Sequence, residues 1–381
     1  MVGNAVRQLG RFGQSIWLDE VGRDLVPSGG LERLIVADGL RGLISGPCAF
    51  EAAVVGCPLY DVEIRALSAQ GRTPKAVYEG VCQTDLQAAA DELRPTFEAT
   101  SGQDGYVSLA TDPRLARQTD AVVQEARRLW ASLERPNALI NVVATAQGPM
   151  ALQQLIAEGI NVNVTLLFSL SRYRQVAEAY IAGLEERAAS GLPLAPVASV
   201  VSFFVSRIDA LVDARLEGQA AQGGEQAALA ETVRGSIGIA CAKLVHQAQL
   251  RAFSSVRFRR LAALGARPQR MLWVSSGTQD PPDGDVKYME ALIGPGTVHA
   301  VGLGALAAYR DQGQPQGRLE KGLAAARAAL GRLPRLGIII DDVTRLLEDE
   351  GVERACRAFD HSVQVVGERA QILGAEIHCV I

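Results

Sequence analysis

The chain lacks the features of several protein classes. No apolar run approaches the length of a membrane-spanning helix, and the N-terminus, MVGNAVRQLGRFGQ, does not have the charged-then-apolar layout of a secretory signal. We therefore expect a cytoplasmic protein with no membrane partner. The cysteines have no CxxC spacing, so neither a zinc site nor a disulfide framework is predicted. They are expected to be reduced thiols: Cys48, Cys57, Cys82, Cys241, Cys356 and Cys379.

An excess of charge of one sign is also missing. The net charge is −4 and the isoelectric point is near 5.7, which argues against nucleic acid or an anionic membrane surface as the main partner. Lysine is rare: of the 38 cationic residues, all but Lys75, Lys243, Lys287 and Lys321 are arginines. With 381 residues that are 48% hydrophobic, the chain is large enough to bury a sizeable core.

The clearest pattern that the chain does have is a βαβ unit over residues 135–173. Residues 138–143 and 162–168 are apolar runs of strand length, and the segment between them has helical spacing. Parallel strands joined by a helix need cover on both faces, so the unit predicts a larger α/β sheet or barrel.

Similar runs recur along the whole chain. We expect strands at 15–19, 42–45, 105–109, 138–143, 162–168, 197–204, 271–274 and 297–301. Eight strands alternating with helices favour an α/β fold of the (β/α)8 (TIM) barrel type with additional helices. No linker or repeat divides the chain, so we assign one domain to residues 1–381. Apolar residues spaced three and four apart predict a C-terminal helix at about 351–373 that packs on the barrel.

The motifs of this pattern resemble the transaldolase family over nearly the whole chain. They are FGQSIWLDEVGRDL, DGLRGLISGP, DGYVSLATDPRLA, RPN…VxxAT…IAEGINVNVTLLFSLSRY, SVVSFFVSRID, QRMLWVSSGTQDP and EDEGVERACRAFD. The resemblance implies a class I aldolase-like barrel, with its active site at the carboxyl ends of the strands. It also implies a lysine that forms a Schiff base with the sugar carbonyl, and Asn141 stands at that position. A carboxamide cannot form this iminium.

Further departures fall on positions that carry the family's chemistry. Gly46 replaces an asparagine that orients the substrate, and Ala110 replaces a glutamate that positions a water molecule. Gln279 replaces a lysine on the phosphate side. Gly46, Ala110, Asn141 and Val143, the last in place of a proline, together remove charge or shorten side chains. They predict a wider and more apolar mouth to the barrel.

Other positions retain the family's residues. Asp19 matches its proton-transfer aspartate, Asn163 and Thr165 match its substrate-holding residues, and Arg207 matches its phosphate-binding arginine. Arginine suits this role because its forked donors fit phosphate oxygens in pairs. Ser202 and Ser275 also match ligand-side serines. Each of these residues has a plainer interpretation, as a cap or an ion pair.

Two more residues could carry chemistry. His299 ends the last predicted strand and is a candidate acid or base, although a lone histidine there is more often structural. Cys48 follows the second strand, but no histidine adjacent in sequence would activate it. The remaining histidines show no metal-ligand spacing, so no metal and no cofactor are predicted.

Three functions remain open at this point. The first is a repurposed enzyme of the transferase or lyase type, without transaldolase activity, that holds the phosphate or diphosphate of a larger or less polar substrate and uses non-covalent acid–base chemistry. The second is an inactive transaldolase relative that binds a metabolite or a partner protein. The third and weakest is residual transaldolase or aldolase activity in the pentose phosphate pathway. A small phosphorylated ligand and a homodimer are the partners considered, in carbohydrate or specialised metabolism.

Overall fold

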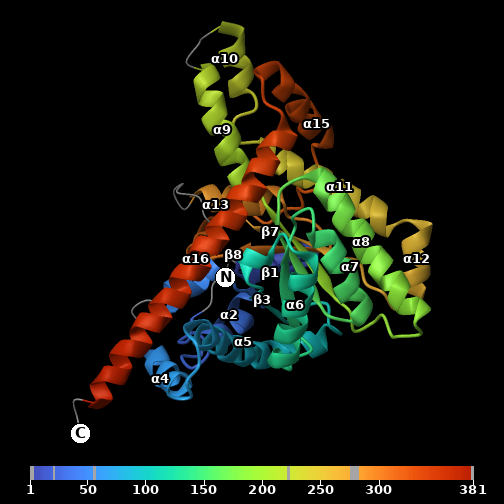
Figure 1. The fold of residues 1–381 in the computed structure, drawn as a ribbon. Helices are drawn as coiled ribbons and strands as arrows, with labels where there is room; N and C mark the ends of the chain where they lie inside the picture. Colours follow the sequence, from blue (N-terminus) through green and yellow to red (C-terminus); the bar gives the residue numbers. More distant parts are fainter. Residues whose placement is uncertain (1–3, 20–21, 55–56, 221–223, 275–282, 379–381) are drawn as a thin grey trace.

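The eight strands form a closed parallel barrel in which each strand pairs with its neighbours in sequence (Figure 1). The computed structural model describes residues 4–19, 22–54, 57–220, 224–274 and 283–378. Its strands are β1 Gln14–Leu18, β2 Leu40–Ile44, β3 Tyr106–Ala110, β4 Ala138–Val143, β5 Val162–Leu167, β6 Ser199–Phe204, β7 Arg270–Val274 and β8 Thr297–Val301. The predicted (β/α)8 barrel with additional helices is confirmed, and each strand lies within about two residues of its predicted position.

Helices surround the barrel and cover the outer face of its strands (Figure 1). In chain order they are α1 Ala5–Gln8, α2 Gly30–Asp38, α3 Pro47–Val54, α4 Asp61–Ala69, α5 Pro74–Ala99, α6 Thr119–Leu133, α7 Gly148–Glu158, α8 Leu170–Ala189, α9 Ser206–Ala220, α10 Gly224–Glu231, α11 Ile237–Phe253, α12 Val256–Ala263, α13 Asp283–Ala291, α14 Leu303–Gln312, α15 Leu323–Arg332 and α16 Ile340–His378. None of the helices in the described ranges is long and apolar enough to cross a membrane.

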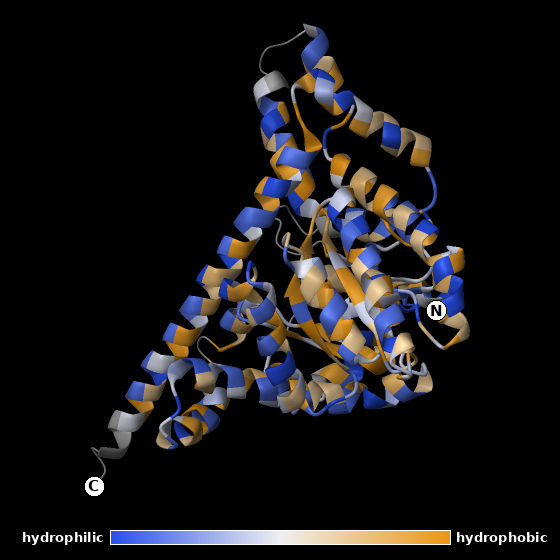
Figure 2. Cartoon of the chain, turned by 45° about the vertical axis from the view of Figure 1, so that its right-hand side comes forward, coloured by the Kyte–Doolittle hydropathy of each residue, from blue (hydrophilic) through white to orange (hydrophobic). Residues whose placement is uncertain are grey.

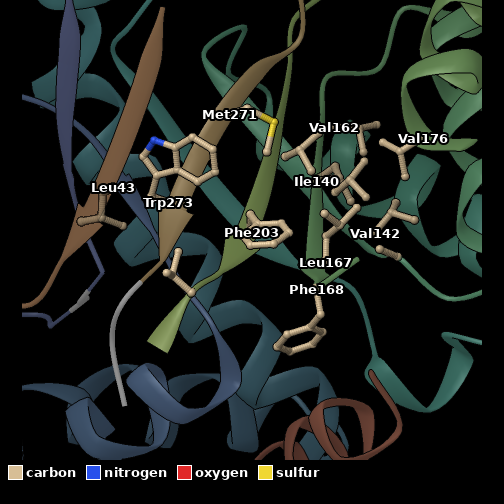
Figure 3. Close-up of a cluster of buried hydrophobic side chains, with 14 of the residues drawn as sticks. Leu43, Ile140, Val142, Val162, Leu167, Phe168, Val176, Phe203, Met271 and Trp273 are labelled. Atoms are coloured by element: carbon tan, nitrogen blue, oxygen red, sulfur yellow. The ribbon is translucent and has the colours of Figure 1, made fainter. Parts of the chain in front are cut away.

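The strands are buried on both faces, as strands of a parallel barrel must be. One set of side chains fills the barrel interior and includes Trp17, Tyr106, Leu139 and Leu272. The alternate set points outward into the layer between strands and helices, where Ile140, Phe203 and Met271 are among those drawn in Figure 3. Figure 2 shows the hydrophobic colour on most of the central strands, whereas hydrophilic and hydrophobic residues alternate along the surrounding helices.

Gly42 on β2 shows how tightly the interior is filled. A Cβ atom at this position would lie 2.5 Å from ring atoms of Trp17, closer than any real contact. Only glycine leaves room for the indole ring, which is fully buried. The interior is therefore a packed core, and space for a ligand has to lie at one of its ends.

The amino-terminal end of the barrel is closed by a polar network around Arg270. Its guanidinium donates to Asp104 at 2.8 Å, to the Ser15 hydroxyl at 2.8 Å and to the Thr297 carbonyl at 2.9 Å. Ser15 in turn donates to Asp104 at 2.7 Å, and the Trp17 indole N–H does so at 3.3 Å. Arg270 and Asp104 are only 9% and 5% exposed, so each charge depends on the other for compensation.

Helix α16 begins before the expected range of about 351–373 and ends after it. Figure 1 shows it, in red, running diagonally across the molecule to the C-terminus. It packs on α3, α4, α5, α9 and β5. Val366 and Phe359 are buried on its inner side, and the Phe359 ring meets Tyr78 edge-on with centroids 5.3 Å apart. This path takes α16 past the carboxyl ends of the strands.

Candidate active site

A cavity of about 370 Å³ opens at the carboxyl ends of the strands. Its size is at the small end of the range for ligand sites. Its polar and charged lining residues come from separate elements and are Asp19, Ser45, Thr111, Asn141, Asn163, Thr165, Arg207 and Arg354. The structure thus brings together most of the residues that the sequence singled out.

A row of hydrogen bonds crosses the barrel just below the cavity. The Ser202 hydroxyl donates to Asn163 Oδ1 at 2.8 Å, and Asn163 Nδ2 donates to Ser108 Oγ at 3.2 Å. Ser108 donates to Asn141 Oδ1, and Asn141 Nδ2 donates to the Ser45 carbonyl at 3.3 Å. Because β3, β4, β5 and β6 are neighbours, inward-facing residues at one level meet and can form such a row.

Asn141 lies in the centre of this row. It is 7% exposed and borders the cavity from β4. Its side-chain oxygen and nitrogen both have partners, and the Thr111 hydroxyl also donates to its backbone carbonyl at 2.9 Å. Asn141 is therefore an ordered amide at the floor of the cavity. Ser202 supports this floor from β6 but does not line the cavity.

Gly46 and Ala110, where the family resemblance implies larger residues, both lie on the cavity wall. A Cβ atom at Gly46 would meet no other atom within 4 Å. The wall is therefore open at Gly46, as the sequence suggested for this side of the mouth.

Asp19 and Arg207 bring opposite charges into the cavity. Asp19 follows β1, and its backbone N–H donates to the Val301 carbonyl at 2.9 Å. Arg207 lies in the first turn of α9, directly after β6, so the two residues enter from strands that are well separated around the barrel. The Arg207 side chain is 14% exposed, and its nearest carboxylate, Glu350, lies 4.0 Å away. Burial, followed by the positive charge of Arg354, lowers the pKa of Arg207.

Leu166 adds a backbone feature to the same wall. Its φ angle is +56°, and the pairing of β5 with β6 is irregular between Val164 and Leu167. A left-handed conformation costs a residue with a side chain about 1–2 kcal/mol. Such conformations cluster at functional sites. Here the irregularity turns the end of β5 toward the cavity, which Leu166 lines together with Thr165.

His299 lies outside this cavity. It is fully buried on β8, next to Ile16 of β1 in the sheet, and its side chain belongs to the outward-facing set. Burial lowers its pKa to about 3, so the ring is neutral at physiological pH. The structure therefore does not bring His299 together with Asp19 and Arg207.

The remaining candidates from the sequence are the Cys48 thiol and the phosphate-side residues Ser275 and Gln279. Cys48 lines the cavity. Although the residue as a whole is exposed, partial burial of the thiol group itself, followed by the negative charge of Glu51, raises the pKa of the thiol. The thiol is therefore protonated at neutral pH and is not an activated nucleophile. Ser275 and Gln279 lie outside the described residues. Within the described ranges, no group of three or more histidine, cysteine or acidic side chains is arranged to hold a metal ion.

No lysine is among the described residues that line the cavity. Lys75 donates to Asp112, whose chain neighbours Thr111 and Pro113 are lining residues. Burial alone would lower the pKa of Lys75, but the hydrogen bond to Asp112 at 2.9 Å and nearby acidic charges raise it. Lys243 lies on α11 and donates to backbone carbonyls at 3.0 and 2.7 Å.

Sequence reasoning missed three residues that the structure places here. Ser108 connects Asn141 to Asn163, and its place two residues before Ala110 on β3 would have indicated an inward side chain. Thr111 lines the cavity one residue after β3 ends. Arg354 comes from α16, and no motif marked it, because the position of a distant helix over the mouth is a tertiary feature.

The chain is similar to known proteins over nearly its full length. A family model described as Transaldolase/Fructose-6-phosphate aldolase matches residues 16–366. A protein named Transaldolase from Thiobacillus denitrificans is 43% identical over 363 residues, which are 95% of this chain and 98% of the relative. A Transaldolase from Thermobifida fusca is 41% identical over 369 residues, 97% of this chain and 99% of the relative. Transaldolase 1 from Streptomyces avermitilis is 40% identical over 379 residues, 98% and 99% respectively.

These relatives correct the functional expectation. We expected a repurposed enzyme without transaldolase activity or, failing that, an inactive relative. Both expectations are wrong, because chains 40–43% identical over nearly the full length are named Transaldolase. Similarity to these relatives extends along nearly the whole chain, whereas the departures that suggested a loss of activity fall on a few positions. The option that was ranked last, transaldolase activity, is the one that the relatives support.

Proposed function

Because this chain belongs to the transaldolase/fructose-6-phosphate aldolase family, we propose that it acts as a transaldolase on phosphorylated sugars. The observation that carries the proposal is the convergence of Asp19, the Asn163 and Thr165 pair, and Arg207 on one cavity at the carboxyl ends of the strands. A carboxylate, amide and hydroxyl groups, and a guanidinium are what a sugar phosphate needs for proton transfer, hydroxyl binding and phosphate binding respectively.

In this proposal the sugar phosphate lies between Arg207 and Asp19. Arg207 binds the phosphate, and Thr165 and Asn163 hold hydroxyl groups along β5. Asp19 accepts the proton of the hydroxyl group on the carbon that becomes an aldehyde. The adjacent carbon–carbon bond then breaks, and its electron pair moves through the carbon beside the ketone onto the ketone oxygen, which becomes an enolate oxygen within reach of a hydrogen bond from the Asn141 amide. When an acceptor aldehyde arrives, the bond forms again and Asp19 returns the proton to the new alkoxide.

The ketone end of the substrate lies at Asn141, on the floor of the cavity. Cleavage needs an electron sink at the ketone carbon, and a carboxamide does not supply one by condensation. Asn141 can still hold the substrate by hydrogen bonding, because a carboxamide has two donor hydrogens and an acceptor oxygen. The experiment therefore asks whether one of the four lysines forms a covalent adduct with the ketone.

The test is a transaldolase assay with sedoheptulose 7-phosphate and glyceraldehyde 3-phosphate. We expect formation of fructose 6-phosphate, which a coupled assay follows. In parallel, borohydride reduction with fructose 6-phosphate and intact mass spectrometry would reveal an amine that forms a covalent adduct, and peptide mapping would locate it among the four lysines. The absence of turnover at high enzyme concentration would overturn the proposal.

The matched variant is Asn141→Lys, which places an amine at the position that the family resemblance assigns to it. We expect a borohydride-trapped adduct at residue 141 and a higher rate than in the unaltered chain. Asn137→Lys is an unsuitable control because Asn137 is fully buried. Gln175→Lys, on the outer helix α8, adds the same charge away from the cavity and should leave the rate unchanged.

A further inference from the structure

Helix α16 contributes to the cavity wall that holds Arg207. Gly351, Arg354 and Ala355 of this helix are lining residues. At Gly351 the helix comes so close that an added Cβ atom would lie 3.7 Å from Nη1 of Arg207 and 3.3 Å from Cδ2 of Leu166. Arg354 is three residues further along, on the same face of the helix as Gly351. Two arginines from distant parts of the chain therefore face one cavity.

The charges in this wall are unbalanced. Of the described lining residues, only Asp19, Arg207 and Arg354 are charged at neutral pH. Arginine remains protonated there, so one carboxylate faces two guanidinium groups. Among the described residues, Arg354 makes no ion pair, while Arg207 has only Glu350 at 4.0 Å, a side chain that is 48% exposed. Two like charges at one cavity repel each other unless an anion lies between them.

We propose that Arg354 is a second phosphate-binding residue, and that it and Arg207 together hold the terminal phosphate group of the substrate. The inference rests on the proposed function for the identity of the substrate but not for the existence of the anion site. A phosphate dianion would separate the two guanidinium groups and balance their charge, and each could donate a forked pair of hydrogen bonds. The C-terminal helix is then part of the binding site as well as a packing element.

The consequence for specificity is a preference for doubly charged phosphate. A neutral sugar would leave the charges of both guanidinium groups at the cavity without an anion to balance them. A phosphorylated sugar would satisfy both. Arg354 therefore acts in binding, and its loss should raise KM for a phosphorylated substrate while changing kcat little, as expected for a group that holds substrate and transition state equally.

Arg357 is the matched control. It lies on the same helix one turn beyond Arg354, is 70% exposed and pairs with Glu353 at 3.7 Å. It is not a lining residue of the cavity. Arg357→Met therefore removes the same charge from the same helix at a position that faces solvent, and any change in long-range electrostatics is shared by the two variants.

The experiment is titration calorimetry with inorganic phosphate at low ionic strength, using the full chain. We expect binding to the unaltered protein, a loss of about tenfold in affinity in Arg354→Met and a similar loss in Arg207→Met. Arg357→Met should stay within about twofold. Arg354→Lys, which keeps the charge without the fork, should fall in between. Circular dichroism establishes that each variant is folded.

Two results would overturn the inference: no phosphate binding to the unaltered protein, or equal affinities in Arg354→Met and Arg357→Met. The assay separates this failure from failure of the proposed function. Phosphate binding that depends on Arg354 without any transaldolase turnover would leave the anion site standing and reject the function. Turnover with the same KM for sedoheptulose 7-phosphate in Arg354→Met would retain the function and reject the role of Arg354.

Discussion

The two ends of the barrel use arginine in different ways. At the amino-terminal end, Arg270 is 9% exposed and lies 2.8 Å from the carboxylate of Asp104. At the carboxyl end, the Arg207 side chain is 14% exposed, but its nearest carboxylate is 4.0 Å away and a second arginine lines the same cavity. The first charge is neutralised inside the protein, whereas the second remains available to a ligand.

Cavity size alone would not point to the end of the barrel that holds Asp19 and Arg207. The amino-terminal end borders a cavity of about 610 Å³, larger than the 370 Å³ at the mouth. Its arginines are already used: Arg270 bonds to Asp104, and Arg267 donates to the backbone carbonyls of Gly102 and Ala195. The arginines at the mouth differ, because among the described residues Arg207 has only the distant carboxylate of Glu350 at 4.0 Å. This difference in charge compensation, and not cavity volume, favours the carboxyl end as the binding site.

The largest expected effect is on the free energy of unfolding, which should differ between arginine variants at the two ends of the barrel. Arg270→Met leaves Asp104 buried without its cation, and the free energy of unfolding should fall by about 3–5 kcal/mol. Arg207→Met removes a charge that faces another arginine, so its free energy of unfolding should change by less than about 1 kcal/mol. Urea denaturation of both variants measures the difference. Equal losses in the two variants would contradict the contrast between the ends.

A double variant sharpens the same prediction. In Arg270→Met with Asp104→Asn, the uncompensated carboxylate is replaced by a neutral amide of similar shape, so part of the lost stability should return. If the double variant is less stable than Arg270→Met alone, the network at this end does not depend on the ion pair.

The next largest expected effect is a loss of stability at acidic pH that depends on His299. Burial lowers its pKa to about 3, whereas in the unfolded chain the value is about 6.5. Between these values the unfolded state binds a proton that the folded state does not. The free energy of unfolding therefore decreases as pH falls through this window, by about 1.4 kcal/mol per pH unit. His299→Leu removes this contribution.

The measurement compares urea denaturation of the unaltered chain and His299→Leu at pH 7 and at pH 4.5. The stability difference between them should shift by roughly 2–3 kcal/mol in favour of the variant at the lower pH. Transaldolase activity per folded molecule at pH 7 should be similar in the two proteins, because His299 does not line the cavity. A constant difference across the pH range would refute the assignment.

The next prediction concerns the effect of Asp19 at the mouth of the barrel on kcat. Asp19→Asn keeps the size of the side chain but cannot accept the proton in cleavage, so kcat should fall about a hundredfold or more. The steady-state assay with sedoheptulose 7-phosphate measures it. Asp24→Asn, five residues further along the chain and outside the cavity lining, serves as the control and should retain the full rate. An unchanged kcat in Asp19→Asn would exclude proton transfer by this residue.

Ser202 gives the smallest effect, because it supports the floor of the mouth from below. Ser202→Ala leaves Asn163 Oδ1 without its donor at 2.8 Å, and the free energy of unfolding should fall by about 1 kcal/mol. Ser190→Ala removes a hydroxyl at the end of α8 that donates only to the Glu186 carbonyl in the last turn of that helix. This variant should change the free energy of unfolding by less than about 0.5 kcal/mol. Thermal denaturation of the pair resolves the difference if Ser202 acts as described.

Much of the fold could be predicted from sequence because its signals are local. Strands of a parallel barrel are short β-branched runs, and they alternate with segments of helical spacing. The runs at 138–143 and 297–301 coincide with β4 and β8. The helix α16 starts at Ile340, earlier than the expected 351, and its first turns also pack into the core through Val343 and Leu347.

The candidate site was predicted less completely. Asp19, Asn141, Asn163, Thr165 and Arg207 share one cavity because strand ends of a barrel meet at one rim. His299 shows that the position of a residue in a strand does not reveal whether its side chain points into the barrel or outward. All five residues of β8 are buried, so there is no polar alternation from which the direction of a side chain could be inferred.

The sequence by itself determined the barrel, the family and the side chains that close its strands, because these depend on local periodicity and on motifs along the chain. Only the tertiary structure decided that α16 crosses the mouth and brings Arg354 to the cavity of Arg207, although 146 positions separate them in the numbering. The physical reason is that the neighbours of a charge, and therefore its need for a ligand, are set by packing between distant elements.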